Sequence, residues 1–179
     1  MPALLYVGDV PVESTYHGSA LLHRLLAAYP AGKLTILETG ALSHPERRLP
    51  QAHYLSYRIG QPRWLNTRFH PQASVWYSYQ GFKKAPQIIG SLNGTQFESI
   101  LTVAHGFGWL AAARMAQRRR VPLHLMVHDD WPRAANVPQA FRGWLDQKFA
   151  RVYQQAQSRM CVSPSMQRDY ESRYGEAAE

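Results

Sequence analysis

Short apolar runs alternate along most of the chain with stretches whose apolar residues recur every three or four positions. Residues 3–8 (ALLYVG) and 33–38 (KLTILE) are largely apolar runs beside turn-forming residues, which is typical of buried strands. Between them, apolar residues follow one helix face from Leu21 to Tyr29, and Pro30 and Gly32 end that pattern. The chain therefore opens as strand, helix and strand.

The same alternation returns in the second half of the chain. Strands are predicted at 99–106 (SILTVAHG), 122–129 (PLHLMVHD) and 159–164 (RMCVSP). Helices are predicted at 107–120, at 139–157, and from Ser163 or Ser165 through Tyr174, with Gly175 as the stop. Because parallel strands need crossover connections, this order predicts an α/β fold: a Rossmann-like three-layer domain with a mostly parallel central sheet and helices on both faces.

The segment from residue 45 to residue 94 departs from this alternation. Residues 52–58 (AHYLSYR) predict a third strand, and the residues after them are rich in Trp, Tyr and Phe, with prolines at 62, 71 and 86. Short helices and loops are expected there, since proline ends or kinks a helix. No internal repeat or linker composition interrupts the chain, so residues 1–179 are expected to form one domain.

Composition narrows the class of protein. No apolar run approaches the ~20 residues needed to cross a bilayer, and the first residues lack the basic start of a signal peptide. Cys161 is the single cysteine, which excludes an internal disulfide and a cysteine-rich metal site. These features predict a cytoplasmic globular protein.

Charge is unevenly distributed along the chain. Twenty Lys and Arg against 12 Asp and Glu give a net charge of +8, and no acidic residue lies between Arg47 and Phe97. Residues 58–84 mix cations with aromatic residues, so one hypothesis is a peripheral contact with anionic lipid at the inner face of a membrane. The alternative is that the aromatic residues belong to the core and the cations to a solvated face. Nucleic acid is not an expected partner, because no recognisable binding motif accompanies the charge.

Polar side chains gather at the predicted carboxyl ends of the strands, where open parallel sheets bind their ligands. His105 follows one strand, His128, Asp129 and Asp130 follow the next, and Ser163 follows the last. Taken singly, His105 can equally be a structural group. No Gly-x-Gly-x-x-Gly follows the first strand, which argues against a nicotinamide enzyme.

Gly18 and Ser19 stand at the predicted start of the first helix, where free backbone N–H groups can hold a phosphate or a sugar hydroxyl. Gly18 can also simply ease the turn into that helix. His128 is the strongest functional candidate, because Asp129 and Asp130 can orient its ring or bind hydroxyls themselves. The histidines and aspartates lack a His-x-x-x-His spacing, so no metal site is expected.

Three parts of the sequence resemble a known protein family. They are residues 4–30 (LLYVGDVPVESTYHGSALLHRLLAAYP), the pair 100–106 (ILTVAHG) and 123–131 (LHLMVHDDW), and residues 150–175 (ARVYQQAQSRMCVSPSMQRDYESRYG). They resemble the N-terminal half of GT-B glycosyltransferases, specifically the family 4-like retaining enzymes, and the likeness extends over about two thirds of the chain. The aromatic middle contributes nothing to this likeness.

The resemblance implies a two-domain enzyme whose N-terminal domain binds the acceptor and whose C-terminal domain, expected to lie outside this chain, binds a sugar nucleotide. By position, His128 resembles the histidine that contacts the transferred sugar, and Gly18 resembles the loop glycine near the donor phosphates. The other residues expected to bind substrate are Ser19, His105, Asp129, Asp130 and Ser163.

The reaction expected from this likeness is transfer of a sugar to a glycan, a lipid-linked acceptor or a small molecule. The sugar nucleotide is a co-substrate, and neither a bound cofactor nor a metal is expected. The isolated half is expected to be inactive or nearly so, because catalysis needs donor and acceptor held together across a cleft. The alternative function is a non-catalytic binding module that uses the basic aromatic surface for an anionic membrane or another anionic partner.

Overall fold

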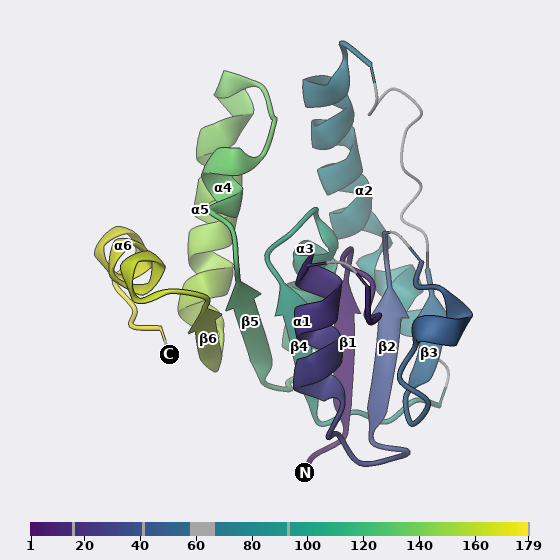
Figure 1. The fold of residues 1–179 in the computed structure, drawn as a ribbon. Helices are drawn as coiled ribbons and strands as arrows, with labels where there is room; N and C mark the ends of the chain where they lie inside the picture. The colour runs from purple at the N-terminus through teal and green to yellow at the C-terminus, as the bar shows by residue number, and fades with distance from the viewer. Residues whose placement is uncertain (16, 41, 58–66, 93, 179) are drawn as a thin grey trace.

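A parallel sheet lies at the centre of the molecule in the computed structural model, which describes residues 1–15, 17–40, 42–57, 67–92 and 94–178 (Figure 1). Within these residues the sheet has six strands in the order β3-β2-β1-β4-β5-β6. The strands are β1 (Leu4–Gly8), β2 (Leu34–Glu38), β3 (His53–Ser56), β4 (Ser99–Val103), β5 (Leu123–Val127) and β6 (Ser158–Cys161). All the pairings are parallel, as the alternating pattern predicts.

The strand order places a switch point between β1 and β4. From β1 the chain builds outward to β2 and β3, then crosses back and builds in the other direction through β4, β5 and β6. Leu4 is paired with Leu34 on one side and with Ser99 on the other. The helices that follow β1 and β4 therefore cover opposite faces of the sheet, and the crevice at the carboxyl edge between them is where such folds bind ligands.

The helices are α1 (His17–Leu26), α2 (His70–Ser91), α3 (Gly108–Arg119), α4 (Trp131–Ala134), α5 (Gln139–Gln155) and α6 (Pro164–Tyr174), with a short 3-10 helix η1 (Pro45–Arg47). Figure 1 shows α1 on one face of the sheet and α3 on the other.

The alternation of side chains along β1 explains how both faces are covered. Leu5 and Val7 join the core cluster that contains the apolar residues of α3 and α5, whereas Leu4 and Tyr6 join Leu22 and other residues on the side of α1. Successive side chains of a strand point to opposite faces, so a strand buried on both faces is apolar throughout. The predicted three-layer arrangement is confirmed.

Helix α2 corrects the expectation of short helices and loops in the middle of the chain. It runs for 22 residues, with one proline in its first turn and Pro86 in its interior. Proline is compatible with the first helical turn, where no N–H bond is lost. The cost of Pro86 is offset because Ala73, Tyr77, Ala85 and Ile88 are buried along one face. Packing against the rest of the core thus overrides the local proline signal.

The third strand and the last helix follow their predictions. β3 lies within the predicted segment and pairs with β2. Ser163 is the N-cap of α6 and accepts a hydrogen bond from the Met166 N–H, and Gly175 ends the helix in the left-handed conformation at φ 76°. Both ends match known capping preferences.

Candidate active site

Two histidines and an aspartate meet at the carboxyl edge of the sheet. β4 and β5 are neighbours, with Val103 opposite Met126, so the residues that follow the two strands lie side by side. The rings of His105 and His128 stack with their centroids 5.7 Å apart and their planes 23° apart. Asp129 Oδ2 lies 3.8 Å from His105 Nδ1 and 3.7 Å from His128 Nδ1. The sheet register thus brings together residues from two loops that are separate in the sequence.

His128 is the inner member of this cluster. Its side chain is 18% exposed, against 52% for His105 and 57% for Asp129. Its Nε2 is buried and has no hydrogen-bond partner among the described residues. Burial is the largest influence and lowers the pKa of His128 from its ordinary 6.5, while Asp129 raises this pKa and His105 lowers it. The ring is therefore neutral at pH 7, with one nitrogen that accepts a hydrogen bond and one that donates.

Gly18 faces His128 from the start of α1. A Cβ placed on Gly18 would lie 3.5 Å from His128 Cε1 and 4.0 Å from its Nε2. The structure therefore brings together two residues that the sequence analysis linked only through their presumed strand and helix ends. Ser19 is only 3% exposed, so its predicted role in binding substrate stays a prediction.

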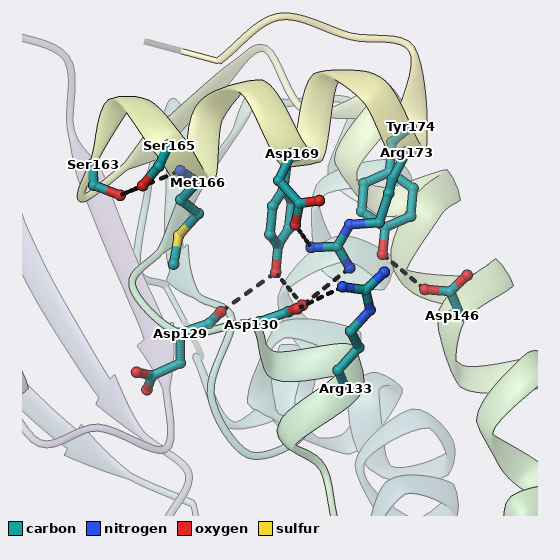
Figure 2. A network of polar contacts seen from close by, with 11 residues as sticks. Asp129, Asp130, Arg133, Asp146, Ser163, Ser165, Met166, Asp169, Arg173 and Tyr174 are labelled. Atoms are coloured by element: carbon teal, nitrogen blue, oxygen red, sulfur yellow. Dashed lines mark hydrogen bonds and ion pairs between the residues drawn. The ribbon is translucent and has the colours of Figure 1, made fainter.

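Asp130 has a different environment from its neighbour Asp129. Its Oδ1 accepts hydrogen bonds from Arg173 at 3.0 Å and from Tyr170 at 3.3 Å, and its Oδ2 lies 3.6 Å from Arg133. Figure 2 shows these groups converging between the loop after β5 and α6. Asp130 therefore joins α6 to the sheet edge, and substrate binding by this residue remains a prediction.

Ser163 also has a structural partner. Its hydroxyl accepts from the Met166 N–H at 3.2 Å and lies 3.0 Å from the Ser165 hydroxyl (Figure 2). The residue follows β6, two strands away from β4. The structure thus assigns it a helix-capping contact, and its predicted contact with substrate is untested.

Asp9 organises the crevice and was not among the predicted site residues. Its carboxylate accepts hydrogen bonds from the backbone N–H groups of Phe107, at 2.5 Å, and Gly108, at 2.8 Å, at the start of α3. It also accepts from the Thr39 hydroxyl at 2.6 Å and from Tyr77 at 3.3 Å. An acidic group is favoured at a helix N-terminus by the helix dipole. The N–H groups at the start of α3 are therefore bound by a side chain of the protein itself.

A cluster of glycines around Asp9 is the sequence signal that could have revealed its role. A Cβ on Gly106 would lie 2.1 Å from Asp9 Oδ2, and one on Gly108 would lie 3.2 Å from Asp9 Oδ1. Gly106 also has a positive φ of 58°, which favours glycine. These glycines let the loop after β4 close over the carboxylate and so position His105.

A small hollow opens beside this loop. It has a volume of about 200 Å³. Its lining combines apolar rings with polar groups: His70, Ser74, Tyr77, Gly106, Phe107, Trp131, Ala135 and Asn136. The α2 residues of this lining fell in the segment expected to form short helices and loops, so the sequence could not place them here.

This arrangement defines a class of fold: a parallel Rossmann-like α/β domain with polar groups at its carboxyl edge. The family model described as Glycosyltransferase Family 4 matches residues 34–179. The chain therefore belongs to glycosyltransferase family 4.

A solved structure from Phytolacca americana supports the fold. It is UGT2 in complex with UDP-2fluoro-glucose and pterostilbene, and it matches with a TM-score of 0.54 at 14% sequence identity. The match covers 92% of this chain and 47% of the other, so the chain spans about half the length of that protein. A search of curated protein sequences found no match.

Proposed function

We propose that this chain is the N-terminal, acceptor-side domain of a retaining, metal-independent glycosyltransferase that takes a sugar from a nucleotide sugar. A second Rossmann-like domain, beyond residue 179, would bind the nucleotide. The observation that carries the proposal is the position of His128 in a family 4 chain. It is a neutral, half-buried imidazole at the switch-point edge, opposite the first turn of α1. The Phytolacca UGT2 structure contains UDP-2fluoro-glucose together with pterostilbene, and such a pair of ligands is consistent with transfer of a sugar from a nucleotide sugar.

His128 acts on the transferred sugar through hydrogen bonding in this proposal. The Asp129 carboxylate lies 3.7 Å from His128 Nδ1, which is longer than a hydrogen bond but close enough to favour the tautomer with a proton on that nitrogen. Nε2 is then an acceptor for a sugar hydroxyl. A buried acceptor without a partner is unfavourable, so a hydroxyl that reaches it is strongly favoured.

Gly18 lets the donor approach the start of α1. The free N–H groups of a helix's first turn attract phosphate oxygens, and a glycine permits close approach of the backbone. Because a Cβ here would make only an ordinary contact at 3.5 Å with His128, the fold tolerates alanine. The added methyl group would nevertheless narrow the space between α1 and the imidazole.

The acceptor, in turn, lies over the hollow beside Gly106. The hollow is lined by the polar residues Ser74, Tyr77 and Asn136 together with apolar rings, a combination that suits a glycan or the polar end of an amphiphile. It adjoins the loop that carries His105, so an acceptor bound there would reach toward the transferred sugar.

Turnover of the protein that includes the residues after Glu179 tests this proposal. A panel of UDP-, GDP- and ADP-sugars is assayed for hydrolysis and transfer with the intact protein. His128→Ala should lower turnover by roughly 100-fold, the cost of losing one group that stabilises a transition state. Gly18→Ala should lower turnover while leaving the midpoint of thermal unfolding unchanged or slightly raised.

The matched control is His53→Ala, an exposed histidine on the edge strand β3. It should leave turnover unaltered. If His128→Ala also retains full turnover, the proposed role of His128 is wrong. If no sugar nucleotide is consumed by the intact protein, the non-catalytic binding module becomes the better account.

A second candidate function, contact with an anionic membrane, is favoured by an apolar groove between α2 and α5. Both helices project beyond the carboxyl ends of the strands in Figure 1. The groove between them has a volume of about 390 Å³. It is lined by Gln72, Val75, Trp76, Ser78, Tyr79, Phe141 and Trp144.

The rim of this groove carries aromatic rings with cations above them. Trp76 is 47% exposed and Tyr79 49% exposed. Lys83 Nζ lies 5.9 Å from the Tyr79 ring centre, and Lys148 Nζ lies 5.7 Å from that of Trp144. Aromatic rings beside ammonium groups suit the headgroup level of an anionic bilayer.

Two parts of the predicted basic aromatic surface do not contribute to this rim. Tyr77 is buried in the core, which agrees with the alternative that the aromatic residues are structural. Residues 58–66 lie outside the described residues. The proposed contact therefore rests on the groove and its rim alone.

The proposed contact is peripheral. No helix among the described residues has the length and apolar character that a bilayer crossing requires. Vesicles of phosphatidylcholine with and without phosphatidylglycerol test it by co-sedimentation. Binding should require the anionic lipid, weaken with salt, and fall at least about tenfold in a Trp76→Ser, Trp144→Ser double variant. Leu21→Ser, which changes an exposed residue of α1, is the control. Equal binding to both kinds of vesicle would contradict the proposal.

A further inference from the structure

The cluster at the carboxyl edge has the donor atoms of a metal site, although its sequence spacing does not show it. His105, His128 and Asp129 each offer one ligand atom, and these three atoms lie within 4.8 Å of one another. Asp129 Oδ2 is almost equally far from the two Nδ1 atoms, at 3.8 and 3.7 Å. In a tetrahedral zinc site with bonds of about 2.0–2.2 Å, ligand atoms lie roughly 3.4 Å apart.

We propose that His105, His128 and Asp129 bind one divalent transition-metal ion of the zinc type. Two imidazole nitrogens and one carboxylate oxygen favour zinc, nickel, copper or cobalt, whereas magnesium and calcium prefer oxygen ligands throughout. Three protein ligands leave the fourth coordination position open toward the crevice.

The fold holds two of the ligands in place and leaves the third able to adjust. The loop that bears His105 is held by the Ala104 N–H bond to the Met126 carbonyl at 2.8 Å, next to the strand that ends before His128. Gly106 and Asp9 close the same loop. Asp129 is the most exposed of the three, at 57% of its side chain, so a small change of rotamer can bring its oxygen to the ion.

The neighbouring residues leave Asp129 available for this role. The polar partners of its carboxylate among the described residues are the two imidazoles. Asp130, the other carboxylate of the loop, is held by Arg173 and Tyr170 and points to α6 in Figure 2. Asp130 thus has a structural role, whereas the carboxylate of Asp129 is available to a ligand.

A bound ion would inhibit the transferase, and this part of the inference rests on the proposed function. The ion would occupy His128 Nδ1 and draw the ring toward Asp129 and His105. With the ion on Nδ1, the imidazole would carry its proton on Nε2, so this nitrogen could no longer accept a hydrogen bond from the sugar hydroxyl. The proposed catalysis needs no metal, so zinc would act as an inhibitor.

Isothermal titration of the 179-residue chain with zinc chloride, after treatment with a chelator, tests the site itself. One equivalent should bind, and His105→Ala and Asp129→Asn should each weaken binding at least about tenfold. His53→Ala is the matched control and should bind like the wild type. Circular dichroism of each variant establishes that it is folded, and cobalt should give the visible absorption of a four-coordinate ion.

Two results would overturn the metal site. One is equal zinc affinity in the wild type and His105→Ala, and the other is equally tight binding of magnesium. The inhibitory role is tested separately in the protein that transfers sugar, where zinc should raise the KM for the sugar nucleotide. Zinc binding with no change in KM would overturn the overlap with the sugar position while the metal site stands.

Discussion

At the scale of single residues, burial and loop geometry decide the chemistry of the candidate site. His128 and His105 are both histidines at strand ends, yet His128 is the more buried of the two, and burial lowers its pKa. Asp9 and Asp129 are both carboxylates at the same edge, yet Asp9 is occupied by the N–H groups at the start of α3. Residue type alone does not distinguish the two histidines or the two aspartates, because their environments are formed by residues from other elements.

The pKa of His128 should therefore respond to its two neighbours in opposite directions. Asp129→Asn should lower the pKa further, because a carboxylate that favours the imidazolium is removed, and His105→Gln should raise it. Proton NMR of the histidine rings, followed from acidic to alkaline pH, measures both. Because the folded pKa is depressed below the ordinary 6.5, the unfolded state binds the proton more readily, and stability should fall as the pH drops through 6.5. A His128 pKa at or above 6.5 would contradict this account.

At the scale of elements, Arg173 links α6 to the loop after β5 at the sheet edge. The Arg173 side chain is 16% exposed and pairs with Asp130 at 3.0 Å and Asp169 at 2.5 Å. Its guanidinium also lies 4.5 Å from the Tyr170 ring centre. The Tyr174 hydroxyl donates to Asp146 of α5 at 2.7 Å, so polar contacts join α6 to different parts of the domain (Figure 2).

Arg173→Ala should destabilise the domain by about 2–3 kcal/mol, because it leaves Asp130 without its main partner and removes the packing on Tyr170. Urea unfolding followed by circular dichroism measures the free energy of unfolding. Arg168→Ala, an exposed arginine of the same helix, should change it by less than about 0.5 kcal/mol. Equal effects in the two variants would show that Arg173 does not hold α6.

At the scale of the whole molecule, one aromatic core links the helices that cover one face of the sheet. Trp109 is fully buried, and its ring contacts Trp131 at 5.7 Å and Phe149 at 5.5 Å between centroids. Its indole N–H donates to the Gly106 carbonyl at 3.1 Å, so the same side chain supports the loop that bears His105. The candidate site and the core are thus parts of one packed unit.

Two tryptophans of very different burial should therefore differ sharply in their contribution to stability. Trp109→Ala should lower the free energy of unfolding by about 3–5 kcal/mol, the cost of a large cavity in a core. Trp144→Ala, at 38% exposure, should cost far less, although the same tryptophan is expected to matter for lipid binding. Urea titrations of both variants measure the difference. Similar losses would contradict the proposed division between core and groove.

Most helices and strands of this domain can be predicted from the sequence, and α2 is the main exception. The strands and most helices follow from local apolar spacing, and Ser163 and Gly175 mark the ends of the last helix because their capping chemistry is local. The proline-containing segment that forms α2 was mispredicted, because burial of Tyr77 and Ile88 against distant residues outweighs a local helix breaker. The groove and the hollow are both lined by residues of α2, so the sequence patterns could not predict them.

By itself, the sequence determined the alternation of elements, the parallel sheet and the polar residues at the strand ends, because these depend on short-range periodicity and residue type. Only the tertiary structure decided which of those residues meet. It stacks His105 on His128, sets Gly18 against the imidazole, and directs Asp130 to Arg173. The physical reason is that strand order and register, which join residues far apart in the chain, are set by the packing of the whole sheet.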